Sequence, residues 1–154
     1  MRISVVEQPP IPKEVKNPET LAYYLAQSLG LIPERGKGDV VIELLLLFRR
    51  ISGVREGVLE EGGHEFPVKN GAMKVKDIWE YLKAKGHRVS LSQLYTTYLS
   101  RFLDAGLITK RKGSMYGLRG QTLELTLDDI FHDLRKVWSK ITEHARRLDA
   151  TFEG

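Results

Sequence analysis

The chain has 154 residues and no cysteine, so disulfide bonds and thiolate metal sites are excluded. It also lacks a long apolar run. The longest one, residues 40–48, is interrupted by Glu43 and is far too short to span a bilayer. The apolar residues 3–6 are followed by Glu7 and are too few for a signal peptide. We therefore expect a soluble protein of a reducing compartment, the cytoplasm, with no membrane partner.

Histidine and the side-chain amides are also scarce. The four histidines, His64, His87, His132 and His144, are scattered, and none belongs to a nucleophile–base pattern. A single histidine among acidic residues in a glycine-rich stretch, as at His64, is a weak basis for a metal site. We therefore predict no catalytic residue, no metal and no cofactor. Two asparagines and four glutamines would suit a thermophilic source.

The positive charge is concentrated in one segment, although the net charge is only +4. Residues 83–119 contain eight Lys and Arg residues and one acid, Asp104, whereas the rest of the chain contains 16 Lys and Arg residues and 19 Asp and Glu residues. Localised positive charge attracts a polyanion better than the same charge spread evenly. The segment 83–119 is therefore expected to face a polyanion.

Three parts are expected along the chain. Residues 1–16, with prolines at 9, 10 and 12, should form an extended arm. Such arms are usually spacers, and the alternative is that its single P-x-x-P match contacts a protein partner. Residues 17–125 should form the main domain, and residues 126–154 a long C-terminal helix. The expected fold class is mainly α with a small antiparallel β-hairpin, that is, α+β.

Cap and stop signals predict the first two helices of the main domain. Asn17 and Pro18 should begin a helix that ends at Gly30. After a loop at residues 33–38, a second helix is expected over 39–51, because an aspartate cap, four leucines and a terminal Arg-Arg pair favour a helix over a buried strand. Its nearly all-apolar composition predicts a central place in the core.

The next segment, residues 53–72, is rich in Gly and Glu and is either a long loop or a loose hairpin with arms at 54–59 and 65–69. A third helix should begin at Val75, because apolar residues then recur at the i, i+3, i+4 and i+7 positions. A short turn containing Gly86 would join this helix to the following one, as in a helix-turn-helix.

The helix after this turn should run from Ser90 to Ala105. Ser90 and Gln93 form a capping-box pattern at its start, and Gly106 ends it. Its apolar face is expected to contain Leu91, Leu94, Tyr95, Tyr98, Leu99, Phe102 and Leu103, with small polar residues on the opposite face. Residues 107–112 and 115–119 then predict two strands around a Gly113-Ser114 turn, and residues 123–125 suggest a further short strand.

Residues 74–119 resemble the winged helix-turn-helix DNA-binding domains of bacterial and archaeal transcription regulators. The resemblance is carried by S-L-S-Q-L-Y-T-T-Y-L-S-R-F-L-D-A-G-L-I and by the basic hairpin K-R-K-G-S-M-Y-G-L; the tyrosine in Q-L-Y-T-T-Y-L and the long C-terminal helix resemble the PadR- and MarR-like dimeric members. It implies a recognition helix in the major groove and a wing, Leu107–Arg119, on the phosphates of double-stranded DNA. The implied DNA-binding residues are Lys85, Arg88, Ser90, Ser92, Gln93, Thr96, Thr97, Ser100, Lys110, Arg111, Lys112 and Arg119.

Gln93 would be placed to make paired hydrogen bonds to adenine, and the absence of an arginine early on the exposed helix face predicts modest sequence selectivity. Each of these residues also has an ordinary interpretation, since solvated helix residues and edge-protecting lysines look the same in a sequence.

The C-terminal helix carries two apolar series with a spacing of seven residues. A stripe of this length exceeds what a small domain can cover, so it predicts a parallel or antiparallel homodimer interface formed by Leu127, Phe131, Leu134, Trp138, Ile141, Ala145 and Leu148. Packing of the stripe on its own domain is the alternative. For the whole chain, the leading hypothesis is a homodimeric DNA-binding transcription regulator, and the alternative is a winged-helix protein-interaction adaptor in transcription or replication machinery.

Overall fold

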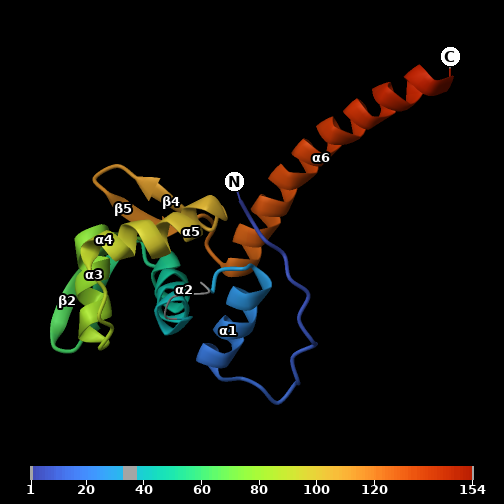
Figure 1. The fold of residues 1–154 in the computed structure, drawn as a ribbon. Helices are drawn as coiled ribbons and strands as arrows, with labels where there is room; N and C mark the ends of the chain where they lie inside the picture. Colours follow the sequence, from blue (N-terminus) through green and yellow to red (C-terminus); the bar gives the residue numbers. More distant parts are fainter. Residues whose placement is uncertain (1, 33–37, 154) are drawn as a thin grey trace.

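The computed structural model describes residues 2–32 and 38–153, and this part of the chain is an α+β fold of five helices and one antiparallel sheet (Figure 1). The helices are α1 (Pro18–Ser28), α2 (Gly38–Ser52), α3 (Val75–Ala84), a continuous helix composed of α4 (Leu91–Gln93), the π-helical η1 (Leu94–Leu99) and α5 (Ser100–Asp104), and α6 (Leu123–Glu153). The strands are β1 (Glu56–Glu61), β2 (His64–Lys69), β3 (Ala72–Lys74), β4 (Ile108–Arg111) and β5 (Met115–Leu118). The expected loop at 33–38 lies, up to residue 37, outside the described residues.

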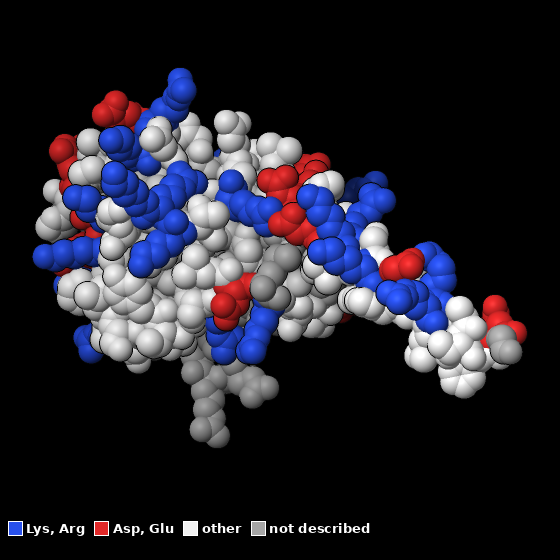
Figure 2. All heavy atoms as spheres, turned by 90° about the horizontal axis from the view of Figure 1, so that it is seen from above, with Lys and Arg blue, Asp and Glu red and all other residues white. Residues whose placement is uncertain are grey.

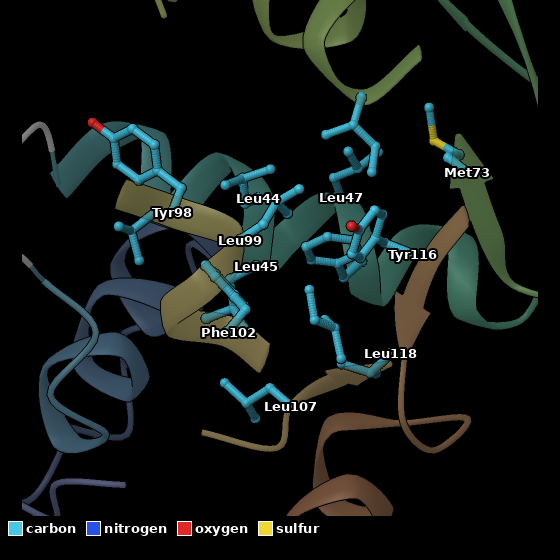
Figure 3. Close-up of a cluster of buried hydrophobic side chains, with 14 of the residues drawn as sticks. Leu44, Leu45, Leu47, Met73, Tyr98, Leu99, Phe102, Leu107, Tyr116 and Leu118 are labelled. Atoms are coloured by element: carbon cyan, nitrogen blue, oxygen red, sulfur yellow. The ribbon is translucent and has the colours of Figure 1, made fainter. Parts of the chain in front are cut away.

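Helix α2 is the centre of the core, as its composition predicts. Seven of its side chains are almost fully buried: Val40, Val41, Leu44, Leu45, Leu47, Phe48 and Ile51. In Figure 3 its leucines lie beside Leu99 and Phe102 of the continuous helix 91–104 and Tyr116 of β5. Each large apolar side chain buried in this way contributes about 1.5–3 kcal/mol relative to its exposed state. The packing around α2 therefore positions both the helix 91–104 and the sheet.

The sheet is larger than the single hairpin that the sequence predicts. Its strand order is β1-β2-β3-β5-β4, with every neighbouring pair antiparallel. The segment 53–72 is a true hairpin, because Gly62 and Gly63 both take positive φ (57° and 79°) in the tight turn between β1 and β2. Strand β3, which the sequence analysis missed, is only three residues long and connects this hairpin to β5.

The turn between α3 and the next helix is held against the core on two sides. The Trp79 indole N–H donates to the Val89 carbonyl at 2.6 Å. His87 lies 3.1 Å from the Glu43 carboxylate and 3.6 Å from that of Asp39, both on α2. The angle between the two helices is thereby fixed by side chains from three elements.

Helix α6 begins at Leu123, so the further strand suggested for residues 123–125 was wrong. The Thr122 hydroxyl accepts the Leu125 N–H at 3.1 Å, which is the geometry of an N-terminal helix cap. The buried Thr126 hydroxyl also accepts the Gly120 N–H at 2.9 Å. These bonds join the chain leaving β5 to the first turn of α6.

The far end of α6 projects from the body of the molecule (Figure 1). Its buried residues are Thr126 and Ile130, and every described residue from Arg135 onward is exposed. At 1.5 Å per residue, the exposed stretch 135–153 is about 28 Å long. None of the helices in the described residues has both the length and the apolar content needed to cross a membrane.

The N-terminal arm lies along its own domain as an extended chain without regular secondary structure. The Val6 N–H donates to the Ser28 carbonyl at the end of α1, and the Arg2 N–H donates to the Asp104 carbonyl at the end of α5. Ile3 is partly buried against the core. The arm therefore connects two helix ends of the same chain, and its proline-rich part, residues 9–12, remains mostly exposed.

Candidate nucleic-acid interface

The start of the helix 91–104 has the capping box that the sequence predicts. The Ser90 hydroxyl accepts the Gln93 backbone N–H at 3.0 Å, and the Gln93 side-chain oxygen accepts the Ser90 N–H at 3.1 Å. Two backbone N–H groups without helical partners are satisfied in this way. The same bond restricts Gln93, because its oxygen has one acceptor position engaged and its side chain is held back toward the start of the helix. The paired contact to adenine expected from the sequence would have to form from this held orientation, with the second lone pair of the oxygen and the NH2 group.

The middle of this helix is wider than an α-helix, which the sequence analysis did not foresee. The Ser100 N–H bonds to the Tyr95 carbonyl five residues back, as in a π-helix. The extra residue in the turn rotates Tyr95 out of the core, where it is 38 % exposed, while Leu94 and Leu99 remain buried. Tyr95 was expected on the apolar face. It instead adds an aromatic ring and a hydroxyl group to the exposed side.

The polar face of the helix consists of short side chains, several of which bond to their own backbone. The Thr96 hydroxyl donates to the Ser92 carbonyl at 2.9 Å, and the Ser100 hydroxyl donates to the Thr96 carbonyl at 2.6 Å. A hydroxyl that has used its proton in this way can only accept from an outside group. Ser92 is exposed and Thr97 is half-buried on the same helix.

The β4–β5 hairpin presents two lysines to solvent. Lys110 and Lys112 are both exposed, and neither makes an ion pair with any described residue. The turn of the β4–β5 hairpin is hydrogen-bonded to α3, since the Ser114 carbonyl accepts the Val75 N–H at the start of that helix. Lys110, on β4, and Lys112, in the turn, thus extend from a hairpin that is bonded to the start of α3.

Arg111 points inward instead of toward solvent. Its guanidinium group crosses β5 and donates to the Asn70 carbonyl, to the Leu118 carbonyl at 3.0 Å and to the Thr109 hydroxyl at 3.3 Å. It crosses at Gly117, where an added Cβ would lie 3.1 Å from the guanidinium and 2.4 Å from the Gly71 carbonyl oxygen. Arg111 therefore holds β4 to the turn before β3, a structural role that the sequence pattern did not reveal.

Two other predicted phosphate contacts are engaged in ion pairs. Arg119 donates to Asp133 of α6 at 2.6 Å, and this bond lowers the pKa of the Asp133 carboxyl group. Lys85 lies 3.3 Å from Glu61 of β1, whose carboxylate raises the pKa of the lysine. Among the predicted cations, Arg88, Lys110 and Lys112 make no ion pair within the described part of the chain and are exposed.

The space-filling view from the β4–β5 side shows Lys and Arg side chains gathered over one part of the globular body (Figure 2). Charges of both signs alternate along the projecting helix α6 in the same view. A region dominated by one sign of charge produces a local potential that favours a polyanion. The positive charge is therefore clustered on part of the body's surface, whereas the projecting part of α6 carries both signs.

The predicted dimer residues divide into two groups along α6. Leu127 and Leu134 are partly buried against the core of their own chain. Phe131, Trp138, Ile141 and Leu148 are 61 %, 68 %, 48 % and 61 % exposed, and Ala145 is also exposed. Phe152, at 84 %, continues the same stripe. Packing on the chain's own domain thus covers only the beginning of the stripe.

Sequence reasoning missed several residues around these surfaces. Tyr95 was hidden because no motif marks a π-turn. Arg49 and Arg55 lie outside the basic segment, yet they line the same groove as Arg111 and Arg119. They come from parts of the chain that are far apart in the sequence and meet only in the fold.

Neither a protein-family model, nor a curated protein, nor a solved structure matches this chain.

Proposed function

We propose that this protein is a homodimeric DNA-binding transcriptional regulator of the winged helix-turn-helix type. The order of the elements supports the proposal: α3, a short turn, the helix 91–104 and the β4–β5 hairpin follow one another around α2. In this arrangement the helix 91–104 enters the major groove and the hairpin follows the phosphate backbone as a wing. The β1–β2 hairpin extends the small sheet on the side away from β4.

The observation that carries the proposal is the location of the unpaired cations. Arg88 precedes the helix start, and Lys110 and Lys112 extend from the hairpin that follows the helix. Because these three charges have no acidic partner in the described residues, they are available to phosphates on both sides of the helix. Lys85, Arg111 and Arg119 are assigned supporting roles.

The helix face predicts weak discrimination between bases. Hydroxyl groups that have already donated to their own backbone, as in Thr96 and Ser100, can only accept hydrogen bonds. Such groups prefer the amino groups of adenine and cytosine, and they make single contacts where an arginine would make two. Most of the affinity should therefore come from phosphates.

The dimer is proposed to form through the projecting half of α6. The apolar positions alternate at spacings of four and three residues, which is the pattern of a two-stranded coiled coil. An in-register parallel pair would place Trp138 against Trp138 and Ala145 against Ala145, giving one overfilled layer and one underfilled layer. An antiparallel pair centred near residue 143 instead places large against small side chains, which fills the layers evenly.

The antiparallel register makes two checkable contacts. Trp138 would face the partner subunit's Leu148, and Arg135 would face the partner subunit's Asp149 at both ends of the overlap. The last buried residue of α6, Ile130, would then lie about 39 Å from its symmetry mate at 1.5 Å per residue.

DNA binding is tested by fluorescence anisotropy with a duplex of random sequence at several salt concentrations, followed by duplexes that vary in sequence. Binding should weaken steeply with salt and vary little with sequence. Affinity that is independent of salt, or a stable complex with another protein that excludes DNA, would favour the adaptor alternative.

The dimer is tested by measuring mass in solution. Trp138→Glu should convert the dimer to a monomer without loss of thermal stability in the monomeric body, because the side chain is 68 % exposed there. Arg135→Asp should weaken the dimer, and the double variant Arg135→Asp, Asp149→Arg should restore it. Failure of the charge swap to restore association would refute the antiparallel register.

A further inference from the structure

A groove of about 720 Å³ lies between the end of α2, the turn before β3 and the connection from β5 to α6. Four arginines line it: Arg49, Arg55, Arg111 and Arg119. None of the lining residues is acidic; the others are Ser52, Gly53, Val54, Asn70, Gly71, Leu118, Gly120, Gln121 and Thr122. The chain thus gathers four positive charges from distant parts of the sequence around one concavity.

Two of the arginines are held in fixed positions. Arg111 is fixed across Gly117 by its bonds to the Asn70 and Leu118 carbonyls, yet three bonds leave two of its five N–H groups without an acceptor. Arg119 is oriented by Asp133, which engages one terminal nitrogen and leaves the rest of the guanidinium group free. Rigid guanidinium groups with spare donors suit planar, paired hydrogen bonds to an oxyanion.

The other two arginines, Arg49 and Arg55, are exposed. Arg49 bonds only to the Ser52 hydroxyl, at 3.3 Å, and Arg55 has no ion pair within the described residues. Among the residues that the structure describes, the Asp133 carboxylate alone pairs with any of the four. Mutual repulsion among such closely grouped charges disfavours the folded state, and an anion in the groove would remove it.

We propose that this arginine groove binds a phosphate-bearing anion. Two sources have the required chemistry: a small molecule with several phosphate groups, such as a nucleoside triphosphate, or the phosphates of a DNA strand. The volume lies within the range of small-ligand sites, and guanidinium groups on both walls match an anion with several phosphates. This inference does not depend on DNA binding by the helix 91–104.

The test uses isothermal titration of the full chain with ATP and with tripolyphosphate, both without divalent metal. The key variant is Arg49→Ala, Arg55→Ala, which removes two exposed side chains and leaves the fixed pair Arg111 and Arg119 in place. Lys140→Ala, Arg147→Ala is the control, since it removes two exposed charges from the distant part of α6. Arg55→Lys retains the positive charge but cannot make the bidentate hydrogen bonds of a guanidinium group.

If the groove binds free anions, the wild type should show saturable binding at one site per chain. The affinity should fall at least about tenfold in the groove variant, by a smaller factor in Arg55→Lys, and not at all in the control. The same variants are then titrated with duplex DNA. If the wild type binds neither ATP nor tripolyphosphate, but the groove variant loses DNA affinity and the control does not, the groove binds the phosphates of a DNA strand.

The proposal is overturned if the groove variant binds both the small anions and DNA with wild-type affinity. It is also overturned if the control variant loses as much affinity as the groove variant. An unchanged melting temperature of each variant shows that a loss of affinity is not caused by unfolding. The DNA-binding proposal would survive this failure if DNA affinity still depended on Lys110 and Lys112.

Discussion

Removal of Lys110 and Lys112 together should reduce DNA affinity without affecting the fold. Both side chains are exposed and have no ion-pair partner in the described residues, so their loss leaves no buried group unsatisfied. Each phosphate contact contributes about 0.9 to the slope of log K against log salt. A dimer that uses Arg88, Lys110 and Lys112 in each protomer engages six phosphates, for a slope of about −5.

The variant Lys110→Ala, Lys112→Ala would lose four of these contacts, so its slope should fall to about −2. At 0.1 M salt, the loss of two contacts in each bound protomer lowers the DNA-binding constant by roughly 60-fold per protomer. Fluorescence anisotropy with several unrelated duplexes measures both quantities, and all duplexes should be affected alike. An unchanged slope, or an equal effect from Lys140→Ala, Arg147→Ala on the distant part of α6, would refute the proposed wing contact.

Three other substitutions test the structural roles. Arg111→Ala should lower the free energy of unfolding by about 1–3 kcal/mol in denaturant titrations, because its hydrogen bonds to Asn70, Leu118 and Thr109 are lost, and an unchanged free energy of unfolding would argue against this structural role. Phe102→Ala should cost about 3–5 kcal/mol, because its ring is buried against Phe48 with centroids 5.6 Å apart; a loss below 1 kcal/mol would contradict the packing. Asp133→Asn should lower the melting temperature at neutral pH, and since the folded-state pKa of Asp133 is lowered by Arg119, this stabilisation is complete above about pH 4 and disappears as the pH falls further. A difference between wild type and variant that does not shrink as the pH falls would rule out the ion pair as its cause.

Local signals in the sequence predicted much of the fold. The Asn17 cap, the capping box of Ser90 and Gln93 and the stop at Gly106 depend on hydrogen bonds or backbone angles within a few residues, and all are present. The buried helix over 39–51 was recognisable because its length and its terminal charges suit a helix better than a strand. Such features depend little on the rest of the chain.

Features that depend on distant contacts were not predictable in the same way. The direction of Arg111 depends on Gly117 and on the Asn70 carbonyl, which lies 41 residues away. Strand β3 is too short to show a period and exists because β2 and β5 both pair with it. The π-turn that exposes Tyr95 follows no sequence motif. Charge concentration was visible in the sequence, but which charges are neutralised by acidic partners was not.

The most direct test of the account is a salt titration of the wild-type protein with a duplex of random sequence, read by fluorescence anisotropy. We predict saturable binding at low salt, with a log–log slope of about −5 for the dimer. No binding at 50 mM salt, or a slope between 0 and −1, would contradict the claim that this chain binds the phosphate backbone of DNA.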